Sequence, residues 1–387
     1  MPLSRSRPYP VARLGIIGGG QLARMIVPEA ARLGCETTVL DPTPESPGGV
    51  LAHRQIVGGL DDGLALRALV EASDVTTFEI ETVDTQILLE LEAAGHRIVP
   101  SPALLAVVQD KLLQKERLHA AGIPSPPFRA LDAPDARSLA DFGLPLVQKA
   151  RRGGYDGRGV AVFKDVVVEE RVLPVPSLVE RFVDYRCELA VLVARDSAGE
   201  VRAWPAVEMV FDERANVLDL LLAPARIDAR EAEEARRVAV AAVEALDGVG
   251  VFGVELFLTR GGAVLVNEIA PRVHNSGHWT IEACRTNQFE QHVRAVVGLP
   301  LGEPLQHSAA AMVNLLGAAD ARGGVALEGL DEALRRPGVA LHLYGKREVR
   351  PFRKMGHVTV TAEDRDTAMA RARAVRACVA IRGTEGA

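Results

Sequence analysis

The chain has few aromatic residues, little lysine and no long apolar run. Aromatic side chains make up 4% of its 387 residues, and only six of its 45 basic residues are lysine. No apolar stretch approaches the roughly 20 residues that a membrane-spanning helix needs. Residues 14–20 are too short and too rich in glycine for the core of a secretion signal. We therefore expect a protein that neither enters a membrane nor is secreted.

Cysteine is scarce as well, and no part of the chain is strongly basic. The four cysteines, Cys35, Cys187, Cys284 and Cys378, are scattered without the spacing of a metal or redox pair, so we expect small buried apolar side chains in a reducing cytoplasm. The net charge is −6 and the pI is near 5.9. This charge balance argues against a nucleic-acid-binding surface.

The length and the order of predicted elements indicate three domains. Strands alternate with helices over residues 1–103, which predicts an open parallel α/β domain. A helix over 102–121 leads into a central domain over 104–299, with a subdomain at about 124–178. Residues 300–387 form a smaller, β-rich domain. The predicted fold class is thus mixed α/β and α+β.

A glycine-rich turn follows the first predicted strand. Gly18, Gly19 and Gly20 precede a helix, and Asp41 ends the next strand. This pattern is typical of dinucleotide-binding domains, and it leaves a nicotinamide-dependent oxidoreductase open as an alternative. The signal is weak, because any strand–helix unit needs small residues where the helix packs on the sheet.

The strongest chemical signal is a hairpin that carries two glutamates among apolar residues. A two-residue turn at Arg260-Gly261 would pair Gly253 with Glu268, making Glu255 and Glu268 diagonal neighbours on one face. Two buried carboxylates repel each other, and a hard divalent cation such as Mg2+ would relieve the repulsion. A half-exposed hairpin with two solvated glutamates is the alternative, and a three-residue turn would separate the pair.

A loop rich in hydrogen-bond donors follows the hairpin. Arg272, His274, Asn275 and Ser276 precede Thr280, which we expect to cap a helix ending near Val297. Cationic side chains beside a helix N-terminus favour an anion. A metal pair next to an anion site predicts phosphoryl chemistry on a small anion.

Two further segments suit phosphate groups. Residues 153–159 contain four glycines among charged side chains between two strands, which predicts a flap over phosphates rather than a Walker A loop. A flexible β-turn is the alternative. Residues 345–354 form a basic cluster on an acidic protein, which is either a phosphate pocket or a solvated charged turn.

These segments together resemble the ATP-grasp enzymes. The similarity is carried by the glycine flap, Glu180-Arg-Phe-Val, the glutamate pair and the run from Ala270 to Thr280. More narrowly, the chain resembles the 5-(carboxyamino)imidazole ribonucleotide synthetase family, nearly from end to end. The run Arg-Val-His-Asn-Ser-Gly-His-Trp-Thr is the most specific part.

The resemblance implies an activity and a set of partners. It implies an ATP-grasp fold with an N-terminal pre-ATP-grasp domain, a homodimer, and ATP as co-substrate with Mg2+. The expected reaction, in purine biosynthesis, is ATP-dependent carboxylation of 5-aminoimidazole ribonucleotide by bicarbonate through carboxyphosphate. A mutase on a separate chain would be the pathway partner. Another ATP-grasp ligase, of the glycinamide ribonucleotide transformylase or biotin carboxylase type, is an alternative.

The resemblance also assigns roles to individual residues. Mg2+ would bind Glu255 and Glu268. Bicarbonate and carboxyphosphate would contact Arg272, His274, Asn275 and Ser276, with His274 a possible base. The ribonucleotide would contact Tyr155, Asp156, Arg158, Lys346 and Arg353. ATP would contact Lys111, Lys149, Gly154, Tyr155, Asp156, Gly157, Arg158, Gly159, Val160, Glu180, Arg181, Phe182, Val183, Glu188, Phe211, Asn267 and Glu268.

Two features depart from the simple expectation. Phe211 stands where similar proteins carry a nucleotide-facing histidine, which removes one polar contact with ATP. Strict alternation would also place Asn267 on the face opposite Glu268. Since the resemblance requires both near ATP, we expect the strand to end or to bulge at this point.

Overall fold

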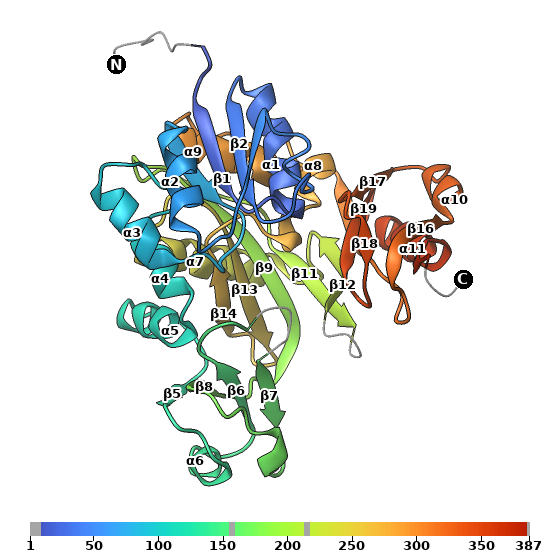
Figure 1. Cartoon of the computed structure of the whole chain (residues 1–387). Coiled ribbons are helices and arrows are strands. Elements are labelled where there is room, and N and C mark those ends of the chain that lie inside the picture. The colour runs from blue at the N-terminus through green and yellow to red at the C-terminus, as the bar shows by residue number, and fades with distance from the viewer. Residues whose placement is uncertain (1–8, 155–158, 213–216, 385–387) are drawn as a thin grey trace.

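The molecule is built around one large mixed sheet with smaller sheets on three sides (Figure 1). The computed structural model describes residues 9–154, 159–212 and 217–384. Four predicted site residues, Tyr155, Asp156, Gly157 and Arg158, therefore lie outside the described residues. Within the described ranges, no helix has the length and apolar character needed to cross a membrane.

The N-terminal part is the predicted open parallel α/β unit. Its sheet has the order β3-β2-β1-β4, and all three pairings are parallel. Ile16 and Ile17 are both fully buried, as expected for a strand covered on two faces. The elements are β1 (Arg13–Ile17), α1 (Gln21–Arg32), β2 (Glu36–Asp41), β3 (Arg54–Val57), α2 (Gly63–Glu71), β4 (Val75–Phe78) and α3 (Thr85–Ala93).

Two helices, rather than the single one expected over 102–121, lead out of this unit. They are α4 (Pro102–Val108) and α5 (Lys111–Ala120). The break lies at Asp110, whose side chain accepts a hydrogen bond from the Leu112 amide and so caps α5. Arg151 holds the same carboxylate with two hydrogen bonds. This capping fixes Lys111 at the first turn of α5.

A four-stranded sheet with the order β5-β8-β6-β7 forms the flap subdomain, at the bottom of Figure 1. Leu146 and Phe163 pair across β6 and β7 and are buried with Leu139 and Val179 in a small core. The elements are β5 (Phe128–Leu131), α6 (Ala136–Ala140), β6 (Leu146–Ala150), β7 (Val160–Phe163), η1 (Glu169–Arg171) and β8 (Ser177–Arg181).

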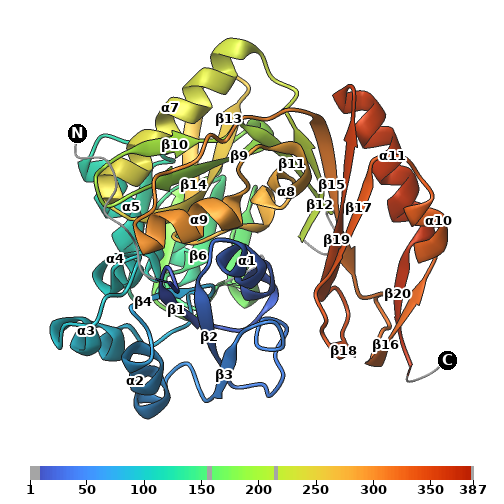
Figure 2. The same cartoon turned by 90° about the horizontal axis from the view of Figure 1, so that it is seen from above.

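The large sheet has nine strands in the order β14-β13-β9-β11-β12-β15-β19-β17, with β10 paired to β9. Helices α7 (Ala229–Leu246) and α9 (Gln288–Val297) cover opposite faces (Figure 2). The strands are β9 (Tyr185–Arg195), β10 (Val201–Ala203), β11 (Val207–Asp212), β12 (Val217–Ala223), β13 (Gly250–Thr259), β14 (Val264–Ala270), β15 (Ala309–Leu316), β17 (Val339–Leu343) and β19 (Lys354–Ala362).

The C-terminal part continues this sheet and adds a small one. Helix α11 (Arg365–Cys378) packs on β15 and β19 through Ala368, Ala372 and Val375. The small sheet has the order β18-β16-β20. Its strands and the remaining helix are β16 (Gly323–Glu328), α10 (Leu330–Leu334), β18 (Glu348–Val349) and β20 (Ala380–Gly383).

Two local expectations were wrong. The helix expected from Thr280 to Val297 is two helices, α8 (Thr280–Ala283) and α9, because residues 283–285 pair with residues 305–307 instead of continuing the helix. Cys35 and Cys284 are buried as expected, but Cys187 and Cys378 are partly exposed.

Candidate active site

The glutamate hairpin forms, but its register differs from the expected one. The turn spans residues 260–262, so Leu258 pairs with Val264 rather than Ala263. A β-bulge then shifts the register, and Glu255 lies directly opposite Glu268 instead of diagonally. The bulge falls at Asn267, where a bulge or a strand end was expected so that Asn267 and Glu268 could both lie near ATP. The longer turn alone would have separated the two carboxylates, and the bulge restores them.

The two carboxylates have different electrostatic environments. Burial, together with the charge of Glu268, raises the pKa of Glu255 to about 8. Glu268 forms a 2.5 Å ion pair with Lys111, which holds its pKa well below the usual value. Two facing carboxylates offer the oxygen ligands that Mg2+ prefers. The residues present therefore fit a divalent cation.

A second cluster joins the large sheet to the flap subdomain. Glu180, at the end of β8, is buried between Lys149 at 2.6 Å and Lys115 at 2.9 Å. Lys149 also donates a hydrogen bond to the Asn267 side chain at 2.8 Å. Burial would raise the pKa of the Glu180 carboxyl, but the two lysines hold it below its usual value. Lys149 thus links the flap sheet to the bulge of β14.

The predicted anion loop lies next to the glutamate pair. The His274 Nε2 atom is 3.6 Å from a Glu255 oxygen, and its Nδ1 atom is 2.8 Å from the Ser276 hydroxyl. Arg272 reaches back to Glu81 of the N-terminal unit at 3.3 Å. His274 and Ser276 therefore lie beside Glu255, and Arg272 is paired with Glu81.

Asn275, the fourth predicted ligand, lies in a short helical turn, η2 (Asn275–Gly277). Its side-chain amide exchanges two hydrogen bonds with Asn314 of β15, at 3.0 and 2.9 Å. The loop is thereby tied to the C-terminal part of the large sheet. Thr280 does not cap a long helix: its hydroxyl donates to the Gly277 carbonyl and accepts from the Gln288 amide.

The N-terminal glycine turn is occupied by the protein's own carboxylates. Asp41 accepts a hydrogen bond from the Gly19 amide at 2.8 Å, and Glu79 accepts from Gly20 at 2.7 Å and Leu22 at 3.1 Å. Their negative charge would repel the pyrophosphate of a dinucleotide. The geometry argues against the oxidoreductase alternative.

The basic cluster of the C-terminal part lies against this same turn. Lys346 donates to the Gln21 side chain and to the Lys354 carbonyl, both at 2.7 Å. Arg353 donates to the Glu348 carbonyl at 2.7 Å. Lys346 therefore stands where the N-terminal and C-terminal parts meet, and Arg353 is bonded within the C-terminal part.

The remaining predicted ATP ligands lie on or just after β8, on β9 and β11, and in the flap. Glu188 of β9 is largely buried, and burial raises its pKa. The Arg181 side chain is held within the flap subdomain, because its guanidinium donates to the carbonyls of residues 142–144. Of the flap, Gly154 and the start of β7 are described. The backbone places Gly154, Gly159 and Val160 at the flap, Phe182 and Val183 after β8, and Phe211 on β11.

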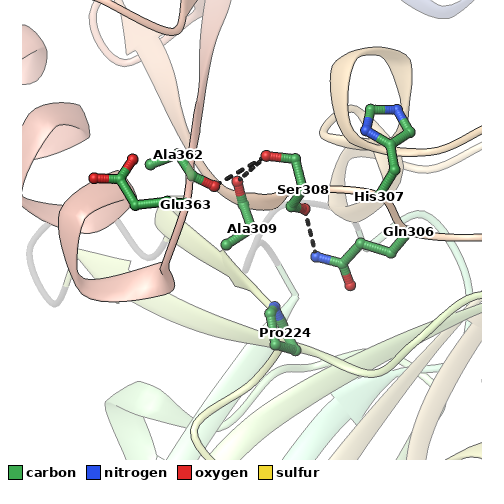
Figure 3. Close-up of a pocket in the computed structure, with 7 residues that line it drawn as sticks. All are labelled: Pro224, Gln306, His307, Ser308, Ala309, Ala362 and Glu363. Carbon is green, nitrogen blue, oxygen red and sulfur yellow. Dashed lines mark hydrogen bonds between the residues drawn. The ribbon is translucent and has the colours of Figure 1, made fainter.

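A separate hollow of about 480 Å3 lies near the ends of β12, β15 and β19. Figure 3 shows the residues that line it. Two of its polar side chains are hydrogen-bonded to backbone carbonyls: Ser308 donates to Ala362, and Gln306 donates to Ser308 and Ala223. None of the predicted site residues lines it.

Several residues of the site escaped the sequence reasoning. Lys115, Gln288 and Asn314 contact predicted ligands, and Gln114 bonds the backbone of Ile269, the residue after Glu268. Lys111, Gln114 and Lys115 follow an i, i+3, i+4 spacing that places them on one helix face, which was a usable signal. Asn314 lies 39 residues from Asn275 along the chain, and nothing local marks it.

The lysine–carboxylate site between a flap sheet and a large sheet defines an ATP-grasp protein. Residues 116–289 match the ATP-grasp domain family, residues 11–109 match the ribonucleotide synthetase preATP-grasp domain, and residues 310–371 match the phosphoribosylaminoimidazole carboxylase C-terminal domain. The chain belongs to the N5-carboxyaminoimidazole ribonucleotide synthase family of ATP-grasp ligases.

Individual relatives support this placement along nearly the whole chain. The N5-carboxyaminoimidazole ribonucleotide synthase of Synechococcus elongatus is 42% identical over 358 residues, which cover 91% of this chain and 90% of the relative. The synthetase structure from Thermotoga maritima is 47% identical, with a TM-score of 0.90 and coverage of 96% and 99%. A synthase from Aspergillus clavatus, solved with ADP and 5-aminoimidazole ribonucleotide, has a TM-score of 0.86 at 34% identity, covering 95% and 98%.

Proposed function

We propose that this ligase carboxylates 5-aminoimidazole ribonucleotide with bicarbonate, consuming ATP and releasing ADP and phosphate, in purine biosynthesis. The observation that carries the proposal is the single site in which the Glu255–Glu268 pair meets Lys111 and His274. The substrate class is inferred from the family to which the chain belongs. The Asn-Ser-Gly-His-Trp segment of the loop distinguishes this chain from other ATP-grasp ligases.

The first step is transfer of the γ-phosphoryl group. A bicarbonate oxygen attacks the γ-phosphorus, the bond to the β-phosphate oxygen breaks, and ADP leaves behind carboxyphosphate. Such transfers depend on positioning and charge neutralisation. We assign these roles to Lys111, Lys149 and Arg272. Mg2+, held by Glu255 and Glu268 when bound, would neutralise phosphate charge.

Lys149 must change partners to reach a phosphate. In the structure it is bonded to Glu180 and Asn267, so ATP would compete for its ammonium group. Lys115 stays beside Glu180 at 2.9 Å and also donates to the Val266 carbonyl. Because Lys115 compensates the Glu180 charge, Lys149 can leave without stranding a buried anion.

The second step forms the carbon–nitrogen bond. The exocyclic amine of the ribonucleotide attacks the carboxyl carbon, phosphate leaves, and the nitrogen loses a proton. His274 is our candidate for the base that accepts this proton, since its Nδ1 is bonded to Ser276 and its Nε2 faces Glu255. Lys346 and Arg353 would bind the ribonucleotide. Carboxyphosphate is sensitive to water, so the site must exclude water during this step.

Phosphate release from ATP tests the proposal. We expect strong stimulation when bicarbonate and 5-aminoimidazole ribonucleotide are both present, and loss of the stimulation in Glu268→Gln. Turnover with glycinamide ribonucleotide and formate, or with biotin, in place of the imidazole would contradict the substrate assignment. A homodimer, a separate mutase partner and a cytoplasmic location stay predictions from the family.

A further inference from the structure

Four buried glutamines share an unusual role in this fold. Each side-chain amide accepts a hydrogen bond from the N–H and donates one to the C=O of a single distant residue, as a neighbouring strand would. Their side chains are at most 3% exposed. We call each such arrangement a clamp. The clamps join Gln114 to Ile269, Gln148 to Leu173, Gln288 to His274 and Gln291 to Gly302.

The Gln114 clamp acts on the strand that carries Glu268. Strand β14 is the edge of the large sheet, so its outer hydrogen-bonding groups have no strand partner. Gln114 bonds both groups of Ile269, at 2.9 and 3.0 Å, and Lys115 donates to the Val266 carbonyl at 2.9 Å. These contacts bracket Asn267 and Glu268, the two residues of the bulge.

The bulge decides where Glu268 points. Without it, the register that pairs Leu256 with Val266 would place Glu268 opposite Val254, on the buried face away from Glu255. A bulge leaves one residue unpaired and disrupts the ladder locally, so contacts from outside the sheet can stabilise it. The Gln114 clamp supplies two such contacts immediately after the bulge.

The Gln288 clamp acts on the anion loop in the same way. Its amide bonds the N–H and C=O of His274, both at 2.8 Å, and also lies 3.2 Å from the His278 ring. It fixes the backbone of His274 where the loop leaves the large sheet. The Gln291 clamp on Gly302, at 2.7 and 2.8 Å, has the same chemistry but holds a segment with no predicted site residue.

We propose that Gln114 and Gln288 are separate positioning residues, Gln114 for the divalent-cation pair and Gln288 for the bicarbonate loop. The inference rests on the proposed assignment of Glu255 and Glu268 to the metal and of His274 to the anion. It predicts that loss of the Gln114 contact weakens cation binding, whereas loss of the Gln288 contact weakens bicarbonate binding. A merely structural role would affect both together.

The test compares Gln114→Leu, Gln288→Leu and Gln291→Leu in two measurements. One is Mn2+ binding with ADP present, followed by electron paramagnetic resonance of free Mn2+; the other is the KM for bicarbonate. Gln114→Leu should weaken Mn2+ binding about 10- to 100-fold, as loss of outer-shell support does at other metal sites. Gln288→Leu should raise the bicarbonate KM about tenfold, equivalent to one well-placed hydrogen bond. Gln291→Leu should shift neither by more than about twofold.

The outcomes separate the inference from the proposed function. Equal shifts in both measurements for Gln114→Leu and Gln288→Leu, or shifts no larger than those of Gln291→Leu, overturn the inference. Gln114→Asn keeps the amide but shortens its reach, and it must show the same selective loss of Mn2+ binding. Glu268→Gln is measured in parallel. If it binds Mn2+ like the unmodified protein, the metal assignment itself fails and the inference fails with it.

Discussion

Substitutions of Asn275 and Asn314 should have strongly non-additive effects on the free energy of unfolding. Both side chains are nearly or fully buried, and each donates to the other. Asn314 also donates to the Leu218 carbonyl at 2.8 Å. Asn314→Leu would leave three buried polar groups without these partners. Taking the lower end of the cost of an unsatisfied buried group for each, we expect a loss of about 3 kcal/mol in the free energy of unfolding.

The double variant gives the decisive comparison. Asn275→Leu alone strands part of the Asn314 amide and should cost about 2 kcal/mol. In Asn275→Leu/Asn314→Leu, two apolar groups face each other and only the Leu218 carbonyl loses a partner, so the cost should fall to about 1 kcal/mol. The double variant should therefore be about 4 kcal/mol more stable than additive single costs would make it.

Urea unfolding followed by tryptophan fluorescence measures these costs, because Trp204 and Trp279 are both fully buried. Gln306→Leu is a suitable control, since it removes two hydrogen bonds beside β15 without touching the loop. Asn314→Leu should also raise the KM for bicarbonate, and Gln306→Leu should leave it unchanged. Additive costs in the double variant would refute the reasoning.

Three further predictions follow from the same geometry. Gly253→Ala would bring a Cβ to 2.6 Å from the His274 Cβ, so kcat/KM should fall at least about tenfold with little change in ADP binding; unchanged kcat/KM would contradict the placement of His274. The pKa of Glu180 is lowered in the folded state, so its stabilising contribution is present above the ordinary value of 4.5 and is lost as the pH falls through the folded value. Glu180→Gln should therefore flatten the acid side of the stability profile, measured by urea unfolding across pH, and an unchanged slope would be contrary to this. Removing divalent cations with EDTA should abolish phosphate release and excess Mg2+ should restore it; full activity in EDTA would exclude the metal role of Glu255 and Glu268.

The sequence revealed the hairpin because carboxylates are out of place in apolar strands. It could not reveal the register. The turn takes three residues rather than two, and the bulge that restores the glutamate pair is supported by Gln114 and Lys115 of a helix about 150 residues earlier in the chain. Such support depends on tertiary packing, which local spacing does not encode.

In the anion loop, too, local sequence predicted the chemistry but not the exact structure. Its donor-rich composition predicted an anion site beside the glutamates, and His274 and Ser276 lie beside Glu255. The helix behind it was predicted as one piece, although residues 283–285 pair with residues 305–307 and interrupt it. The glycine turn at 18–20 was ambiguous in sequence, and only the folded chain shows that Asp41 and Glu79 occupy its amides.

The fate of a bicarbonate oxygen tests the central claim most directly. The reaction should be run with ATP, 5-aminoimidazole ribonucleotide and 18O-labelled bicarbonate, and the released phosphate analysed by mass spectrometry. If a bicarbonate oxygen attacks the γ-phosphorus in the site formed by Glu255, Glu268 and the anion loop, each phosphate carries one oxygen from bicarbonate. Phosphate whose added oxygen comes only from water would show that ATP is hydrolysed without carboxyphosphate, and would contradict the account.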